Sequence, residues 1–480
     1  ILRPELRYLS DKDLEYVHNL ALELLEDMGI ELCAEEARDY FRQAGATVEG
    51  EIVKIPRKII EDALKTVPKR DAFTLYGRDP KNDVKVNKAL PSLAAMTMAT
   101  SVIDPHTREK RPATDQDLTD LTKLLEIMDN VSIASGLITP QDVPLESSDW
   151  YTWAGTIKNT TKHITGGAVG KEGVRDAVEM AQLALGGDIA FEDRPFISFW
   201  VLTSPPMKLD ENPLNVLMEA SRLNAPSVIS SGGILGISSP ITIESAIIHT
   251  HAETLAGIAL TQLVRPGVSV LYSSYVRSMD MQTMSVSMSS PETAIMKSIM
   301  AELGRYLDLP TKMPTNLRDA KLLDAQAGFE TGMVGTVGAL TTDFLVSMQL
   351  DIDLVVDYAD LPYSNECMSQ LRRLVRGLDF SDKRIALDNI RKTGHGGSYL
   401  NAKHTAKNFR KELWTGDLTE RGNWKSWQKD GGKDMLEKCA ERAVELLEQV
   451  KDVTLLDAAV CDKIDAIADS AFEKAKAIKR

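Results

Sequence analysis

A (β/α)8 barrel of the α/β class, extended by helical regions at both ends, is the fold that the sequence predicts. Short runs rich in β-branched residues alternate with longer helical patterns through the middle of the chain, and eight such runs occur, roughly 30–40 residues apart. Eight alternating units favour a closed parallel barrel. An open doubly wound sheet is the alternative, and the lack of a Gly-x-Gly-x-x-Gly motif after the first run weakens it.

The eight predicted strands are separated by readable helices. Thr114 is placed to cap the helix after the first strand, and Gly186 ends the helix after the third. The strands themselves are predicted at Thr97–Ile103, Val131–Ile138, His163–Val169, Phe196–Thr203, Ser227–Ser231, Val268–Ser273, Thr311–Thr315 and Asp351–Tyr358.

The regions on either side of the barrel differ from it in pattern. Residues 1–92 are expected to form a helical subdomain with short strands, since Ser10 and Asp13 make a capping signal and Pro56 suits the start of a helix. Short strands are predicted at FTLYG and DVKVN. The barrel is assigned to residues 93–365. Residues 366–480 turn helical and charged, and we expect them to pack on the barrel or on a dimer partner.

Composition and charge exclude several classes of function. The chain has 480 residues, 43% of them hydrophobic, with a net charge of −14. This charge disfavours nucleic acid and an anionic membrane surface as partners. The N-terminal residues contain no apolar signal core, and no apolar stretch approaches the ~20 residues that span a bilayer. Four widely spaced cysteines indicate reduced thiols, so we expect a cytoplasmic protein.

The active site of such a barrel lies at the C-terminal ends of its strands. The residues at the predicted ends include many aromatics, hydroxyls and carboxylates, with few Lys or Arg and no phosphate-binding glycine loop. Aromatic rings attract an ammonium group by cation–π contact, worth ~0.5–2 kcal/mol per ring. The sequence therefore predicts a pocket for a small cation. Its candidate rings are Trp200, Tyr272, Tyr275, Tyr358 and Tyr363.

The sequence offers little support for a metal or a nucleophile. His249 and Glu253 are four residues apart on one helix face, and His395 and His404 flank a glycine-rich turn, but no second ligand pair accompanies either. Cys367 is a thiol near the presumed mouth without a His or Asn placed to activate it. We therefore predict no metal site.

Several blocks of the chain resemble the trimethylamine methyltransferase family, and they occur in the same order. They include DAKLLDAQAGFE (319–330), HAETLAGIALTQLVRPGVSVLY (251–272), SPETAIM (290–296), ELGRYLDLP (302–310) and GHGGSYLNAKHTAKNFR (394–410). The resemblance extends from about Leu9 to near the end. It implies the same barrel fold and a methyl transfer from an amine to the cobalt of a separate corrinoid protein. It also implies that this chain holds no tightly bound cofactor and forms a homo-oligomer.

The resemblance also narrows the substrate. Some members of the family carry pyrrolysine, which is held to activate trimethylamine, whereas this chain has standard residues only. Relatives without pyrrolysine demethylate quaternary amines such as glycine betaine or proline betaine. The position corresponding to pyrrolysine is estimated near Asn316–Asp319. A quaternary amine already has a neutral leaving group, so catalysis can rest on positioning a methyl group in line with Co(I).

These implications add candidate residues to the predicted site. Asn316, Asp319 and Glu330 are the catalytic candidates, and Phe329 is expected at the mouth. A betaine carries a carboxylate, for which Arg277, Arg318 or Asn316 could supply the donor. Three alternatives remain: a trimethylamine-type enzyme, a zinc-dependent corrinoid methyltransferase, and a noncatalytic barrel that binds betaines.

Overall fold

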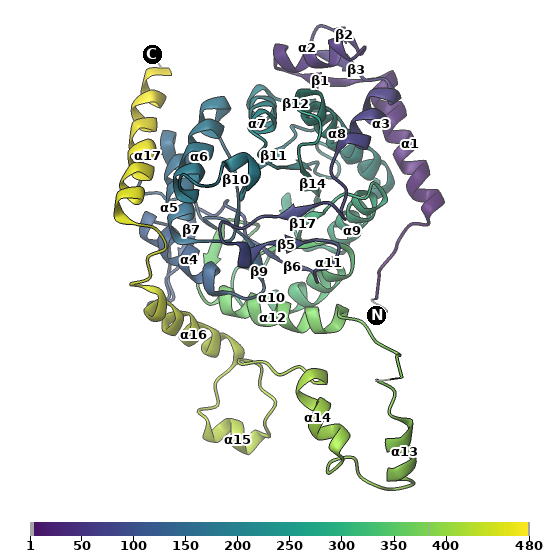
Figure 1. Cartoon of the computed structure of the whole chain (residues 1–480), viewed down its shortest axis with the longest axis vertical. Helices are drawn as coiled ribbons and strands as arrows, with labels where there is room; N and C mark the ends of the chain where they lie inside the picture. Colours follow the sequence, from purple (N-terminus) through teal and green to yellow (C-terminus); the bar gives the residue numbers. More distant parts are fainter. Residues whose placement is uncertain (1–3, 383, 479–480) are drawn as a thin grey trace.

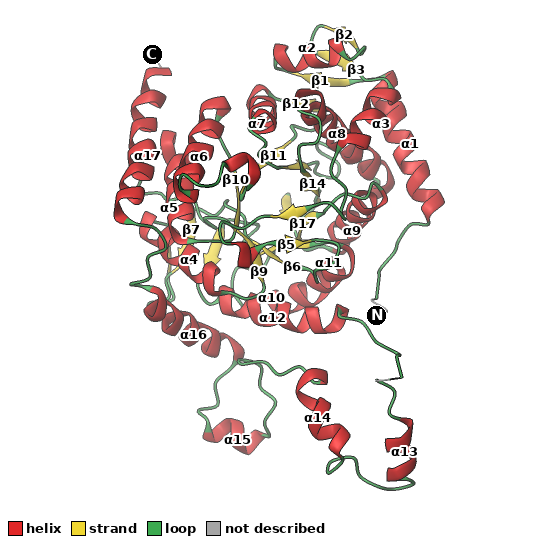
Figure 2. Cartoon of the chain, viewed as in Figure 1, coloured by secondary structure: helices red, strands yellow, loops and turns green. Residues whose placement is uncertain are grey.

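The computed structural model describes residues 4–382 and 384–478, and its centre is a barrel of eight parallel strands. A parallel bridge between Tyr272 and Thr311 joins the two edge strands and closes the barrel. Figure 2 shows the strands surrounded by a ring of helices, which confirms the predicted fold class. The barrel strands are β6 (Ser92–Ala94), β9 (Val131–Ala134), β10 (His163–Gly166), β11 (Ile197–Leu202), β13 (Ser227–Ser231), β14 (Val270–Ser274), β17 (Lys312–Asn316) and β18 (Phe344–Ser347).

A helical segment follows each barrel strand and packs outside it (Figure 1). The predicted Thr114 cap is present, because its side chain accepts a hydrogen bond from the backbone of Asp117. The seventh segment is broken by a π-helical turn at Thr331–Gly335. In chain order the eight segments are α4 (Asp115–Ile127), α5 (Ser148–Asn159), α6 (Gly170–Leu185), α7 (Glu211–Arg222), α8 (Ile243–Val264), α9 (Pro291–Tyr306), α10 (Ala325–Glu330) with α11 (Thr336–Thr341), and α12 (Asp360–Val375).

Six of the predicted barrel strands are confirmed, and the first and the eighth are wrong. The segments predicted for them instead contain β7 (Ser101–Ile103) and β19 (Val355–Asp357), which pair with each other and with β8 (Lys110–Pro112) in a separate sheet. The first and eighth strands of the barrel are β6 and β18. The β-branched residues of the two predicted runs do form strands, but the sheet that a strand joins depends on the strands available to pair with it.

The N-terminal region forms a small layer beside the barrel. Strand β12 (Lys208–Leu209) leaves the barrel to pair with β1, which ties the two parts together. The capping signal at Ser10 is confirmed, and Pro56 lies one position before the helix rather than in its first turn. The layer contains α1 (Asp11–Asp27), β1 (Ile30–Leu32), α2 (Glu35–Gln43), β2 (Thr47–Glu49), β3 (Ile52–Lys54) and α3 (Arg57–Thr66).

The two ends of the barrel differ. The hairpin of β4 (Thr74–Leu75) and β5 (Val84–Lys85), predicted from FTLYG and DVKVN, closes the N-terminal end. Its neighbours Phe73 and Val86 belong to the apolar cluster that fills the lumen, together with Val228 and Phe344. At the opposite end Leu202, the last residue of β11, keeps 37% of its surface exposed. The C-terminal end of the strands is here called the mouth, and it is the end where active sites of such barrels lie.

The C-terminal region has two parts. Helices α16 (Met435–Val450) and α17 (Ala458–Ile478) return to the body, where α16 contacts α12 and α4, and α17 contacts α5 and α6. Between α12 and α16 a projecting segment carries three short helices (Figure 1). These are α13 (Leu387–Thr393), α14 (Lys403–Glu412) and α15 (Trp424–Lys429). None of the helices in the described residues combines the length and apolarity needed to cross a bilayer.

Candidate active site at the mouth of the barrel

The deep lumen holds a satisfied polar network. His163 Nε2 lies 2.9 Å from Ser198 Oγ, which is also 2.8 Å from Thr165 Oγ1. His163 Nδ1 lies 2.9 Å from the carbonyl oxygen of Tyr76, in the segment that closes the N-terminal end. Burial lowers the pKa of His163 to about 3, so the ring is neutral at ordinary pH. This network joins β10 and β11 to the segment that follows β4.

Two predicted rings meet at the mouth. The centroids of Trp200, on β11, and Tyr275, just after β14, lie 5.7 Å apart at 77°, an edge-to-face arrangement. The guanidinium carbon of Arg277 lies 4.7 Å from the Tyr275 ring, and Lys312 Nζ lies 4.8 Å from the Trp200 ring. The indole nitrogen of Trp200 is buried without a hydrogen-bond partner. The rings therefore form an aromatic corner with a basic group already against each.

Among the described residues Arg277, Lys297 and Lys312 form no ion pair, although the Asp319 carboxylate acts on Lys297 and favours its charged form. Arg277 donates a long hydrogen bond of 3.3 Å to the Tyr275 carbonyl, Lys297 on α9 donates one of 2.6 Å to the Pro314 carbonyl, and Lys312 Nζ makes none. Burial lowers the pKa of Arg277 to about 10 and those of Lys297 and Lys312 to about 7. Buried basic groups without an ion-pair partner favour contact with an anionic group.

Lys312→Met tests the buried amine directly. In the folded protein burial lowers the pKa of the amine to about 7, whereas in the unfolded chain it keeps the ordinary lysine pKa of 10.5. The unfolded state binds more protons between these values, so Lys312 makes stability rise with pH in that window. The variant should lower this slope by up to about 1.4 kcal/mol per pH unit, measured by urea unfolding from pH 7 to 10. Lys58→Met, at an exposed position, should leave the slope unchanged.

Two other candidate rings lie away from the mouth. The hydroxyl of Tyr272 is 2.7 Å from His251 Nδ1, and a helix residue, Gly304, lies against its ring, so it faces the helical layer. Tyr358 donates to Asp117 on α4 at 2.7 Å, because the run that carries it belongs to the side sheet. Both rings are buried. This placement gives neither ring contact with the Trp200–Tyr275 corner.

The three catalytic candidates hold the loop after β17. Asp319 accepts hydrogen bonds from Ser287 Oγ and from the Met288 amide. Glu330 accepts from the amides of Asp319 and Ala320, at 3.0 and 3.2 Å. Asn316 donates to Ser347 Oγ at 2.7 Å, and its side-chain oxygen is buried without a partner. A cavity of about 840 Å³ at the mouth is lined by residues that include Leu235, Asp319, Gln326 and Ile352.

The remaining candidates gather around a second cavity of about 650 Å³, beside α12. Tyr363 and Cys367 line it, and burial raises the pKa of the Cys367 thiol to about 11, which opposes a nucleophilic role. Arg318 is fully buried and paired with Asp360, so its charge is already compensated. Phe329, 69% exposed, lies on the short helix α10 near this cavity.

Several buried polar residues near the site were not among those predicted from the sequence. Lys297 and Lys312 sit inside apolar patterns, TAIMKSIM and TKMPT, where a lysine conflicts with burial; that conflict is the signal that could have found them. Gln349 and Asp353, after β18, each have a buried side-chain oxygen without a partner. They were missed because the eighth strand was placed at the wrong segment. Buried polar atoms without partners point to water or a ligand.

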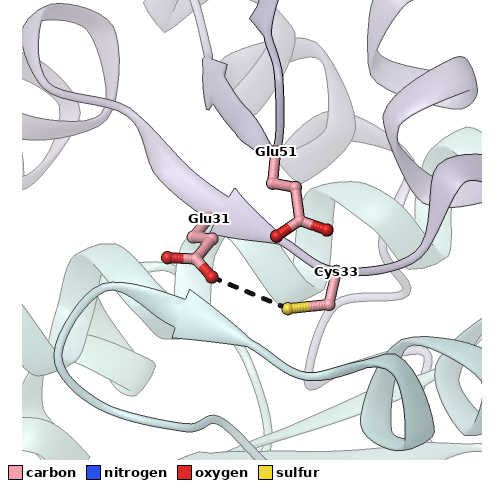
Figure 3. Close-up of side chains that lie close together, drawn as sticks. All are labelled: Glu31, Cys33 and Glu51. Carbon is pink, nitrogen blue, oxygen red and sulfur yellow. Dashed lines mark hydrogen bonds between the residues drawn. The ribbon is translucent and has the colours of Figure 1, made fainter.

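Two groups of metal-ligand side chains among the described residues already have protein partners. His249 Nε2 lies 3.3 Å from Glu253 Oε1, and burial raises the pKa of Glu253 to about 7, but Thr203 and Ser231 already donate to its carboxylate. Figure 3 shows Glu31, Cys33 and Glu51 close together in the N-terminal layer. The Lys208 ammonium lies 3.2 Å from Glu31 and supplies the positive charge there.

A family model and relatives of similar sequence show the family of this chain, and a solved structure shows its fold. The model of the trimethylamine methyltransferase family matches residues 2–471. The chain is 31% identical to a glycine betaine methyltransferase of Desulfitobacterium hafniense strain Y51, over 89% of this chain and 90% of the relative. It is 29% identical to a trimethylamine methyltransferase of D. hafniense strain DSM 10664 / DCB-2, over 92% and 89%. Its fold is similar to the monomethylamine methyltransferase structure from Methanosarcina barkeri, with a TM-score of 0.54 at 13% identity over 94% and 89% of the chains.

Proposed function

Since this chain belongs to the trimethylamine methyltransferase family, we propose that it moves a methyl group from a betaine to the Co(I) of a corrinoid protein. A betaine is a quaternary amine that also carries a carboxylate. The relative named for glycine betaine supports this substrate class. The corrinoid is then a second substrate, delivered by a cognate protein, and the chain itself holds no tightly bound cofactor.

The observation that carries the proposal is the unpaired positive charge at the mouth. Arg277 has no carboxylate partner among the described residues, while Arg318 is committed to Asp360 and the Asn316 amide to Ser347. Of the three donors that the sequence suggested for a substrate carboxylate, Arg277 is therefore the one left free. A guanidinium binds a carboxylate through two parallel hydrogen bonds. A cation without a carboxylate would leave the Arg277 guanidinium without an anionic partner.

The remaining parts of the site serve orientation. Trp200 and Tyr275 lie beside Arg277, so the ammonium of a zwitterion whose carboxylate binds Arg277 would lie near these two rings. Cobalt attacks the methyl carbon with its electron pair, the C–N bond breaks, and the nitrogen keeps the bonding pair as a neutral tertiary amine. No proton has to move in this step. The chain therefore needs to hold the methyl group in line and to exclude water.

A methyl-transfer screen tests the proposal. The chain is mixed with a Co(I) corrinoid protein and with glycine betaine, proline betaine, choline, tetramethylammonium or trimethylamine, and formation of methyl-cobalt is followed by visible absorbance. We expect turnover of at least one betaine and none of trimethylamine. Turnover of trimethylamine without any betaine would refute the proposal. Betaine binding without methyl transfer would indicate a binding protein. Stoichiometric bound zinc whose removal abolishes activity would indicate the zinc-dependent class.

A further inference from the structure

The segment that follows β18 is fixed across the mouth of the barrel. The side-chain amide of Gln349 donates to the carbonyl oxygens of Met96 and Leu137, at 2.8 and 2.9 Å, and these two residues follow β6 and β9. Three positions further on, Ile352 lines the cavity at the mouth and packs against the apolar cluster that includes Tyr275. The segment therefore lies at the same end of the barrel as the aromatic corner.

This segment contains three consecutive residues in the left-handed region. Asp351, Ile352 and Asp353 have φ angles of 51°, 58° and 73°. Aspartate tolerates this conformation, but a β-branched isoleucine rarely adopts it. The loop after β17 holds the turn from outside. The Asp351 amide donates to the Ala320 carbonyl at 2.9 Å, and the Ile352 amide donates to another carbonyl of that loop at 3.1 Å. Backbone strain that the surroundings enforce in this way is most common at active sites and ligand clamps.

The turn buries a carboxylate without a counter-ion. Asp353 is 2% exposed, one of its carboxylate oxygens is buried without a hydrogen-bond partner, and it forms no ion pair among the described residues. Burial raises the pKa of this carboxyl to about 7, so a substantial fraction is charged at neutral pH. A water molecule can donate a hydrogen bond to the oxygen but cannot neutralise the charge. A buried carboxylate of this kind therefore favours contact with a cation.

The cation that suits this carboxylate is a quaternary ammonium. A metal ion needs several ligands, and within the described chain Asp353 does not belong to a group of acidic, His or Cys side chains close enough to share one. A primary ammonium needs an acceptor for each of its three N–H groups. A quaternary ammonium has no N–H group, so one carboxylate and the faces of nearby rings are sufficient partners.

Asp353 and Arg277 follow barrel strands that are separated by a single strand. Strand β17 lies between β14 and β18, and neighbouring strands are ~4.8 Å apart, so the ends of β14 and β18 are roughly 10 Å apart. A small molecule with a carboxylate and an ammonium can contact both groups. Building on the proposed function, we propose that Asp353 is the counter-ion of the substrate's quaternary ammonium and that, with Arg277, it makes the site specific for zwitterionic amines.

Binding of a betaine and of its carbon analogue tests this role. The analogue has carbon in place of nitrogen, as 3,3-dimethylbutyrate has relative to glycine betaine, so it keeps the shape and the carboxylate but lacks the positive charge. Isothermal titration calorimetry on the full chain measures both affinities, with the betaine that the methyl-transfer screen identifies. The wild type should bind the betaine about tenfold or more tightly than the analogue.

Asp353→Asn should abolish this preference. We expect it to weaken betaine binding by about tenfold or more and to leave binding of the analogue nearly unchanged. Asparagine keeps the size of the side chain and tolerates the left-handed backbone. The matched control is Asp351→Asn in the same turn, where the carboxylate is partly exposed and already paired with Lys321. This control should keep the wild-type preference.

A stability measurement separates ligand binding from a structural role. At pH 8 the Asp353 carboxylate is charged in the folded chain, since its pKa is about 7, and it has no partner there. Asp353→Asn should therefore raise the urea midpoint of unfolding at this pH, because it removes a buried charge. A carboxylate that served only to hold the fold together would give a lower midpoint when replaced.

Two results would overturn the role of Asp353. An Asp353→Asn chain that still prefers the betaine to the wild-type degree holds the ammonium at another group. An Asp353→Asn chain with a lowered urea midpoint at pH 8 has lost a structural contact. Either result in a chain that turns over a betaine leaves the proposed function intact. A wild type that turns over no betaine would overturn both.

Discussion

Arg277→Gln is expected to raise the KM for a betaine by about 30-fold or more. The guanidinium is largely buried beside Gly232 and Tyr275 and has no competing carboxylate among the described residues, so a substrate carboxylate would be its ionic partner. Removing one member of a buried charge pair costs about 2–5 kcal/mol in binding. The measurement is the initial rate of methyl-cobalt formation over a range of betaine concentrations, at saturating corrinoid protein.

Two further variants separate charge from packing. Arg277→Lys keeps a positive charge but loses the two-pronged geometry, so its KM should lie between the wild type and Arg277→Gln. Arg421→Gln also removes an arginine stacked on a ring, in this case Trp414, at a position away from the Trp200–Tyr275 corner. It should leave the KM unchanged. If Arg277→Gln turns over betaine with the wild-type KM, the carboxylate is held elsewhere.

Arg318→Met is expected to destabilise the fold by about 3–5 kcal/mol, because it leaves the buried Asp360 carboxylate without its counter-ion. Both side chains are 0% exposed. Burial already raises the pKa of Asp360, so the unpaired acid would have to take up a proton or remain charged in an apolar setting. The pair joins the loop after β17 to the start of α12. Urea unfolding at neutral pH measures the loss.

An exposed ion pair serves as the control for this loss of stability. Arg391 and Asp388 lie 2.8 Å apart with side chains 73% and 97% exposed, and Arg391→Met should change the free energy of unfolding by less than about 1 kcal/mol. Arg318→Met combined with Asp360→Leu should recover part of the stability, since no buried charge then remains. A loss below about 1 kcal/mol for Arg318→Met alone would mean that Asp360 reaches solvent or another donor.

The periodic parts of the fold could be predicted because their signals are local. The capping box at Ser10, the cap at Thr114 and six barrel strands depend on residues a few positions apart, and the structure has them nearly as expected. The first and eighth strands failed for a physical reason. The segments around Val102 and Val356 have the stronger β pattern, yet they pair with each other, and the short strands β6 and β18 complete the barrel.

The sequence by itself determined the barrel, its family and the types of residue at its mouth. Only the tertiary structure decided which of them meet. It brings Trp200, Tyr275 and Arg277 together, turns Tyr272 toward His251, and commits Arg318 to Asp360. It also places Lys312 under Trp200 without a partner. A one-residue change in strand position reverses the face that a side chain occupies, and the partner of a charge lies far away in sequence. Residue spacing along the chain therefore predicts the secondary-structure elements, whereas only three-dimensional packing decides which side chains meet at the site.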